Sequence, residues 1–197
     1  MIDLAISLSY QYKSVILAVH VLGVVIGMGA ATAADFIFIK FLKDLKISIH
    51  EQNVLKNLSQ IIWFGLFIVV VAGIGLFLSD ISYYSSSPKF IMKMLAVLII
   101  ILNALTLNFI ITPKLTKINF GEIVKTGDKK LRNLRRLAFA SGAVSITSWY
   151  CAFLLGVIKV SFLSFGGFFF AYLVILSTAV IISQIAEARI LKIEKLI

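Results

Sequence analysis

The sequence predicts an all-α fold, a polytopic membrane bundle of five transmembrane helices. Hydrophobic residues make up 60% of the 197 residues and charged residues only 14%, and the mean hydropathy is +1.04. A soluble chain of this length could not bury so much apolar surface. Helices satisfy their own backbone in lipid, and about 20 apolar residues span the bilayer. The segments that reach this length are roughly 14–39, 59–79, 90–112, 137–158 and 162–186.

The chain is expected to form a single transmembrane domain, 1–197, because no segment has the composition of a soluble domain. Residues 1–13 have neither a basic region nor a small-residue cleavage site, which argues against a removable signal peptide. We expect them to form an interfacial segment or the first turns of the first helix. Residues 80–88 form a short polar connection, in which Tyr83 and Tyr84 suit the aromatic belt at the membrane interface.

Basic residues predict the orientation of the chain. Its net charge is +10, and 15 of its 19 Lys and Arg residues lie on one side of the predicted spans, in the 40–58 and 113–136 connections and in the C-terminal tail. The positive-inside rule therefore predicts an outside N-terminus and a cytoplasmic C-terminus. Topology and anionic lipid explain this basic charge without a nucleic-acid partner.

The first predicted span contains an unusual segment from His20 to Asp35. It begins with the only histidine of the hydrophobic segments, and it ends with the only carboxylate well inside one. Seven Gly or Ala residues lie between them. Four of these share a helix face with His20, namely Gly23, Gly27, Ala31 and Ala34. A small-residue stripe lets either another helix or a flat ligand come close.

The helical rise separates the polar residues into two levels. At 1.5 Å per residue, His20 lies about 9 Å and Lys93 about 5 Å below the outer membrane boundary. Asp35 and Asn108 lie near the inner ends of their helices, and Asn103 falls between the two levels. His20 and Asp35 are about 22 Å apart along one helix, so they cannot serve one reaction centre directly.

His20 is the strongest candidate for chemistry. A histidine inside a membrane helix must face the protein interior and find a partner there. As a neutral imidazole it can ligate haem iron, accept a proton or hydrogen-bond to a neighbouring helix. Lys93 either joins His20 in an outer pocket or extends its amine to the interface.

The inner polar residues have a structural and a functional interpretation. Asp35 either pairs with Lys40 or Lys114 at the inner surface or helps to form a polar path for protons or solutes. Asn103 and Asn108 would belong to the same path, although asparagines in membranes also join helices by hydrogen bonds.

Several kinds of site are excluded by the sequence. It contains no phosphate-binding glycine loop, no His-x-x-x-His pair and no Cys-x-x-Cys motif. The lone Cys151 excludes an intramolecular disulfide. His50 lies outside the predicted spans, so one chain cannot supply two histidines to a haem at one level. Met92 and Met94 point about 200° apart on a helix and cannot hold one copper ion together.

The pattern of spans one to three resembles the HemJ-type protoporphyrinogen oxidases and the related CopD-like membrane proteins. Members carry a histidine followed by glycines on the first helix and a lysine at the start of a later apolar helix. The counterparts here are His20 with Gly23 and Gly27, and Lys93 before Met94-Leu95-Ala96-Val97. The resemblance implies that the histidine ligates haem and that the lysine contributes to activity.

Three hypotheses of function follow, and they leave open whether the protein is an enzyme. The first is a haem-associated redox protein or oxidoreductase. His20 would be the metal ligand of haem b, Gly23 and Gly27 would line the cofactor, and Lys93 would pair with a propionate or substrate carboxylate and act as the catalytic residue.

The second hypothesis is a small-solute or proton-coupled transporter that uses Asp35, Asn103 and Asn108. The third is a non-catalytic subunit whose Gly/Ala face packs against a second copy of the chain or a partner subunit. All three place the chain in the lipid bilayer of a bacterial-type cytoplasmic (inner) membrane.

Overall fold

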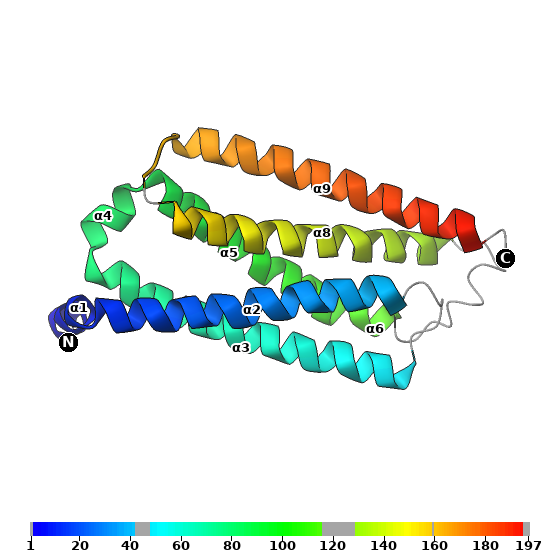
Figure 1. Cartoon of the computed structure of the whole chain (residues 1–197), viewed down its shortest axis with the longest axis horizontal. Coiled ribbons are helices and arrows are strands. Elements are labelled where there is room, and N and C mark those ends of the chain that lie inside the picture. Colours follow the sequence, from blue (N-terminus) through cyan, green and yellow to red (C-terminus); the bar gives the residue numbers. More distant parts are fainter. Residues whose placement is uncertain (1, 42–47, 116–128, 159, 195–197) are drawn as a thin grey trace.

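The chain folds into five long helices that run up and down through one elongated bundle (Figure 1). The computed structural model describes residues 2–41, 48–115, 129–158 and 160–194. All regular secondary structure in these ranges is helical, and five helical spans are long and apolar enough to cross a membrane. The predicted fold class is therefore confirmed, and the protein is a multi-pass membrane protein. The long helices are α2 (Lys13–Phe41), α3 (Ile49–Ser79), α5 (Pro88–Thr106), α8 (Lys129–Val157) and α9 (Phe165–Glu194).

Several helix boundaries differ from the prediction. Helix α3 begins at Ile49, well before the predicted residue 59, because Ser48 and Glu51 form a reciprocal capping box at its first turn. Helix α9 begins at Phe165 and not at 162. Helix α8 begins at Lys129 and not at 137. The prediction followed apolar residues alone, so it missed the polar first turns of α3 and α8 and included the apolar residues that precede α9.

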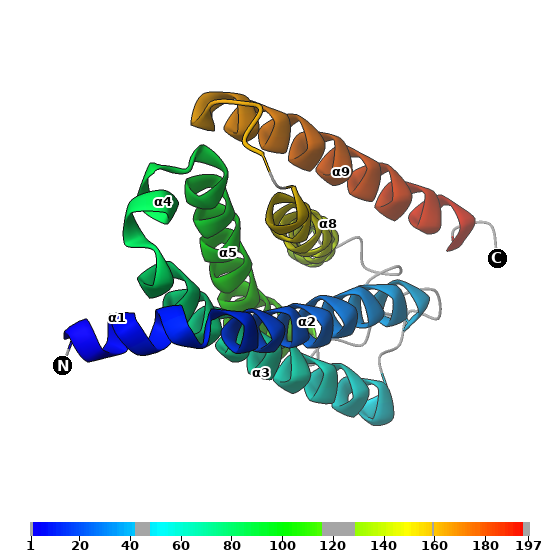
Figure 2. The same cartoon turned by 60° about the vertical axis from the view of Figure 1, so that its left-hand side comes forward.

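Short helices connect or extend the long ones. Helix α1 (Ile2–Gln11) is separate from α2 and contacts α3. It is seen nearly end-on in Figure 1, where α2 lies lengthwise, and it is seen lengthwise in Figure 2, so it turns away from the axis of α2. The polar connection after α3 contains α4 (Ile81–Ser86), where the Asp80 carboxylate caps the helix by accepting from Tyr83 N–H.

The third span does not keep regular α-helical geometry along its whole length. Helix α5 continues as a π-helical turn, η2 (Leu107–Ile111), and then as α6 (Thr112–Leu115). The wider turn precedes Pro113, whose ring would clash with the carbonyl of Phe109 in an undistorted α-helix.

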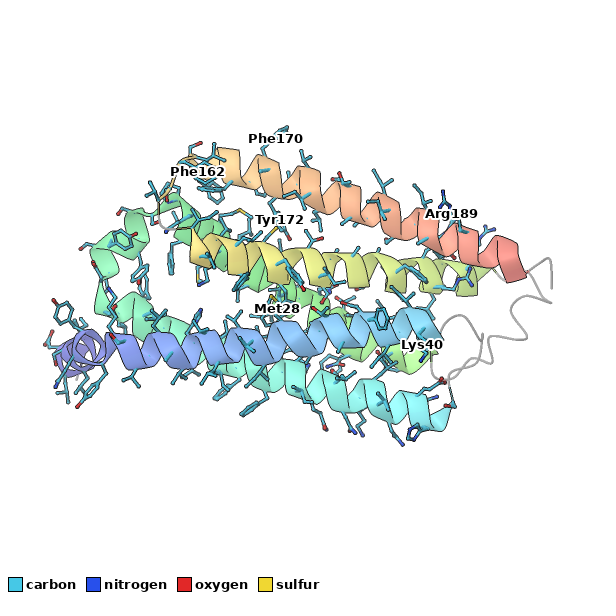
Figure 3. The ribbon with its side chains drawn as sticks, in the orientation of Figure 1. Met28, Lys40, Phe162, Phe170, Tyr172 and Arg189 are labelled. Carbon is cyan, nitrogen blue, oxygen red and sulfur yellow. The ribbon has the colours of Figure 1, made fainter. Side chains whose placement is uncertain are left out.

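The two ends of the bundle are chemically different. Figure 3 shows Lys40 and Arg189 near the same end, which we call the basic end. It is where α2 and α6 finish and where α3 and α8 begin. Helices α1 and α4 lie at the opposite end (Figure 1), which we call the tyrosine end after Tyr83 and Tyr84.

Helices α2 and α3 form the most extensive helix pair, and glycines make this possible. A Cβ atom on Gly65 of α3 would lie 2.5 Å from the backbone nitrogen of Gly27 and 2.6 Å from its Cα. A Cβ on Gly23 would lie 2.9 Å from the backbone nitrogen of Val69. The two backbones are therefore in direct contact, as small residues allow in membrane helices.

Helix α8 is the central element of the other half, since it contacts α2, α5 and α9. Its Trp149 is 3% exposed and packs onto α2, where a Cβ on Gly27 would lie 2.5 Å from the indole ring. The core cluster around this indole comprises Ala31, Leu66, Ala96, Ile100, Trp149 and Ala152. Long apolar side chains such as Phe170, which is 69% exposed, point outward (Figure 3), as expected for a surface in lipid.

Candidate functional site

The structure brings His20 and Lys93 together. Helix α2 supplies the histidine and α5 the lysine, and Lys93 Nζ lies 3.2 Å from His20 Nε2. His20 is only 5% exposed. If the amine donates this hydrogen bond, it engages the Nε2 lone pair, and the ring proton then belongs on Nδ1.

Small residues make room for this pair. A Cβ on Gly73 of α3 would lie 3.5 Å from the imidazole, and a Cβ on Gly156 of α8 would lie 3.7 Å from Lys93 Nζ. His20 Nδ1 is buried without a hydrogen-bond partner of good geometry. The backbone of Val69 interacts with the imidazole, and its carbonyl can attract the ring proton.

The pair lies in a cavity of about 300 Å³, which we call the His20 pocket. Its wall is mostly apolar, and it also includes Tyr83, Tyr84 and Lys89 near the tyrosine end. Lys89 donates to the carbonyl of Ile158 over 2.6 Å. Within the described residues, no carboxylate lies within 4.0 Å of Lys93 Nζ. The pocket therefore presents the Lys93 amine without a carboxylate among its described neighbours.

Gly23 and Gly27, which the sequence suggested as cofactor neighbours, lie outside the lining of this pocket. The backbone and side chains of α3 cover Gly23, and Trp149 with Gly65 covers Gly27. The small-residue stripe is thus occupied by helix packing in this structure.

Asp35 lies in a second cavity, of about 660 Å³, toward the basic end. We call it the Asp35 cavity. Its carboxyl group faces α8, where a Cβ on Gly142 would lie 3.1 Å from Oδ1. Oδ2 is buried without a hydrogen-bond partner. The predicted ion pair with Lys40 or Lys114 is not formed, since Asp35 has no ion pair with any described residue.

Asn108 lines the same cavity from the π-helical turn η2. Its side-chain carbonyl accepts a 2.9 Å hydrogen bond from the Ser59 hydroxyl of α3. The wall also carries three further amide side chains, together with Trp63 and Phe38; the amides are Gln52, Asn53 and Gln60.

Asn103 does not line either cavity. Its amide donates to the Ser141 carbonyl over 2.9 Å and accepts from the Ser141 hydroxyl over 2.6 Å, so it joins α5 to α8. The Trp149 core cluster lies between the two cavities, which share no lining residue. In this conformation the inner and outer polar levels are separate.

Sequence reasoning missed a buried ion pair between α8 and α9. Glu187 is 1% exposed, and its Oε1 accepts from Arg135 Nε over 2.9 Å. Arg136 Nε lies 3.8 Å from Oε2. Asp35 is therefore not the only carboxylate buried in the bundle. The sequence signal that could have predicted this pair is the opposite charge of Arg135 and Glu187, which lie at the same end of two consecutive spans.

The remaining potential metal ligands do not assemble. The described residues contain no group of three or more His, Cys, Asp or Glu side chains that could hold a metal ion. Met92 is fully buried whereas Met94 is 40% exposed, in agreement with their predicted opposite directions. Comparison of the chain with protein-family models, with curated proteins and with solved structures finds no match.

Proposed function

We propose that the His20 pocket binds an amphipathic molecule that carries a carboxylate. The observation that supports this is the Lys93 amine, held 3.2 Å from His20 in an apolar cavity without a carboxylate among its described neighbours. As an ammonium it would be an unpaired charge within the membrane, which is costly. A ligand carboxylate would neutralise it, and the apolar wall would hold the rest of the molecule.

Among amphipathic molecules that carry a carboxylate, haem b is the redox cofactor that we propose. Its binding would make the protein a haem-associated oxidoreductase. An imidazole nitrogen is a common axial ligand of haem iron, and a propionate is a natural partner for Lys93. The fit is incomplete, because Nε2 already contacts Lys93 and because about 300 Å³ is the lower end of the range for small-molecule sites. A tetrapyrrole would need a wider pocket, so we assign no reaction step to haem.

Two measurements test this proposal separately. For haem, protein purified after haem-replete expression should show a Soret band that is lost in His20→Ala, and a colourless preparation would contradict haem binding. For the wider ligand class, cis-parinaric acid should bind more tightly than its methyl ester, and Lys93→Met should remove this preference. Lys13→Met is the matched control, because Lys13 is a lysine of the same end of the bundle that does not line the pocket. If the acid and the ester bind equally well to the parent protein, the pocket does not select a carboxylate.

Transport of a small solute or of protons is the second candidate function, and the Asp35 cavity favours it. A buried carboxyl group without a partner, open to a polar wall, suits a site that accepts a proton or a cation. Passage across the membrane would require the Trp149 core cluster to open and the Asn103–Ser141 pair to exchange partners. Flux into liposomes that is abolished by Asp35→Asn would support this function, and flux unaffected by the substitution would oppose it.

A further inference from the structure

Among the described residues, the carboxyl groups of Asp35 and Glu187 both have buried oxygens, and their environments are opposite. Glu187 contacts Arg135 at 2.8 Å and Arg136 at 3.8 Å, so its charge is compensated by the protein itself. Asp35 has no basic side chain within ion-pair distance among the described residues, and its Oδ2 lacks any hydrogen bond. Burying a carboxylate without a partner is strongly unfavourable. A positively charged ligand would remove this cost.

The cavity beside Asp35 has the size of a small-molecule site. Its volume of about 660 Å³ falls within the usual range for such sites and far exceeds that of a metal ion. The described part of the chain also lacks the cluster of acidic or histidine ligands that a metal ion requires. The cavity thus suits an organic molecule better than a bare metal ion.

The wall offers what an organic cation needs besides the carboxylate. Trp63 and Phe38 line the cavity, and aromatic faces attract organic cations through their ring electrons. The amides of Gln52, Gln60 and Asn108 provide polar contacts. Gly142 leaves the space that the Asp35 carboxyl group occupies, since even a methyl group there would approach Oδ1 to 3.1 Å.

We propose that the Asp35 cavity binds a small organic cation whose charged nitrogen pairs with the Asp35 carboxylate. The site does not depend on ligand binding in the His20 pocket, because the two cavities share no lining residue. The proposal gives the second candidate function, transport, a substrate class, namely small organic cations. If the cation binds but does not cross the membrane in liposomes, the binding site stands and the transport function is wrong.

Lys56 is the one basic side chain among the described residues that line the cavity, and it is exposed at the side of α3. It opposes a cation weakly, because exposed charges are well screened. Replacing it by Gln should therefore leave the affinity for a cation unchanged or increase it. A loss of cation binding in Lys56→Gln would contradict this electrostatic account of the cavity and would overturn the proposal.

The test uses 1-methylpyridinium chloride with the full-length protein in detergent, with sodium chloride titrated in parallel for ionic strength. Isothermal titration calorimetry should show saturable binding whose dissociation constant rises at least tenfold in Asp35→Asn. Quenching of Trp63 fluorescence in a Trp149→Phe background should saturate at the same concentrations, which locates the probe. Asp3→Asn is the matched control, because Asp3 is exposed on α1.

A second variant guards against misfolding of Asp35→Asn. Gly142→Ala keeps the carboxyl group but displaces it, so it should also weaken binding. If the probe binds Asp35→Asn as tightly as the parent protein, or if quenching stays linear without saturation, the proposal is wrong.

Discussion

The backbone contact between α2 and α3 makes a quantitative prediction about Gly65. In Gly65→Ala, the new methyl group would lie 2.5 Å from the Gly27 backbone nitrogen and 2.6 Å from its Cα, whereas ordinary contact begins at 3.4 Å. The obstacle is backbone, which cannot rotate away as a side chain can. The helices must therefore separate by about 1 Å at this point, or the helix axes must tilt.

The matched control is Gly29→Ala on α2, where an added methyl group meets nothing within 4 Å. Both substitutions gain about 1 kcal/mol of helix propensity, so this term cancels when the two variants are compared. The remaining difference is the overpacking cost, which is typically about 1–3 kcal/mol. We expect the free energy of unfolding of Gly65→Ala to be lower than that of Gly29→Ala by this amount.

Unfolding of the purified proteins in mild detergent, titrated with sodium dodecyl sulfate and followed by circular dichroism, measures this difference. The midpoint should move to lower denaturant in Gly65→Ala, whereas it should stay or rise in Gly29→Ala. Equal midpoints in the two variants would refute the close α2–α3 contact and, with it, the assignment of the small-residue stripe to helix packing.

Three further predictions concern the rest of the bundle. Glu187→Gln should destabilise the protein by about 3–5 kcal/mol, because it removes the negative charge of a buried ion pair whose Arg135 Nη2–Glu187 Oε1 distance is 2.8 Å, and the same unfolding titration measures the loss. Ser141→Ala removes the hydroxyl that donates to Asn103 and should cost about 0.6 kcal/mol, the average for hydrogen bonds between membrane helices, and at most about 1.7 kcal/mol; a larger loss would indicate a role beyond this one bond. For orientation, Ser85→Cys in a cysteine-free background should react with an impermeant maleimide added outside intact cells, and protection from the reagent would reverse the proposed topology.

Part of the architecture could be predicted because membrane insertion depends on local composition. Each span is apolar over a length that the bilayer dictates, so five helices were visible without any knowledge of their neighbours. Charged and polar residues beyond the apolar segments still belong to the helices, as at Ile49–Leu58, and composition alone placed these boundaries too far inward.

For the candidate site residues, the sequence predicted only the depth of each side chain in the membrane and not the contacts that it makes. The rise per residue put His20 and Lys93 at similar depth, and the structure brings them to 3.2 Å. The same reasoning suggested a basic partner for Asp35 at the inner surface, yet its carboxyl group turns toward Gly142 of α8. Depth depends on position along one helix, whereas contact depends on the rotation of two helices about their axes.

The sequence by itself determined that this chain crosses the membrane five times, and it identified the small-residue face of the first long helix. Only the tertiary structure decided what covers that face and which polar groups meet. Lipid is as apolar as the side chains that face it, so hydrophobicity does not tell one helix face from another. Backbone contact at Gly27 and Gly65, and the polar pairs at His20–Lys93 and Arg135–Glu187, depend on specific packing between helices.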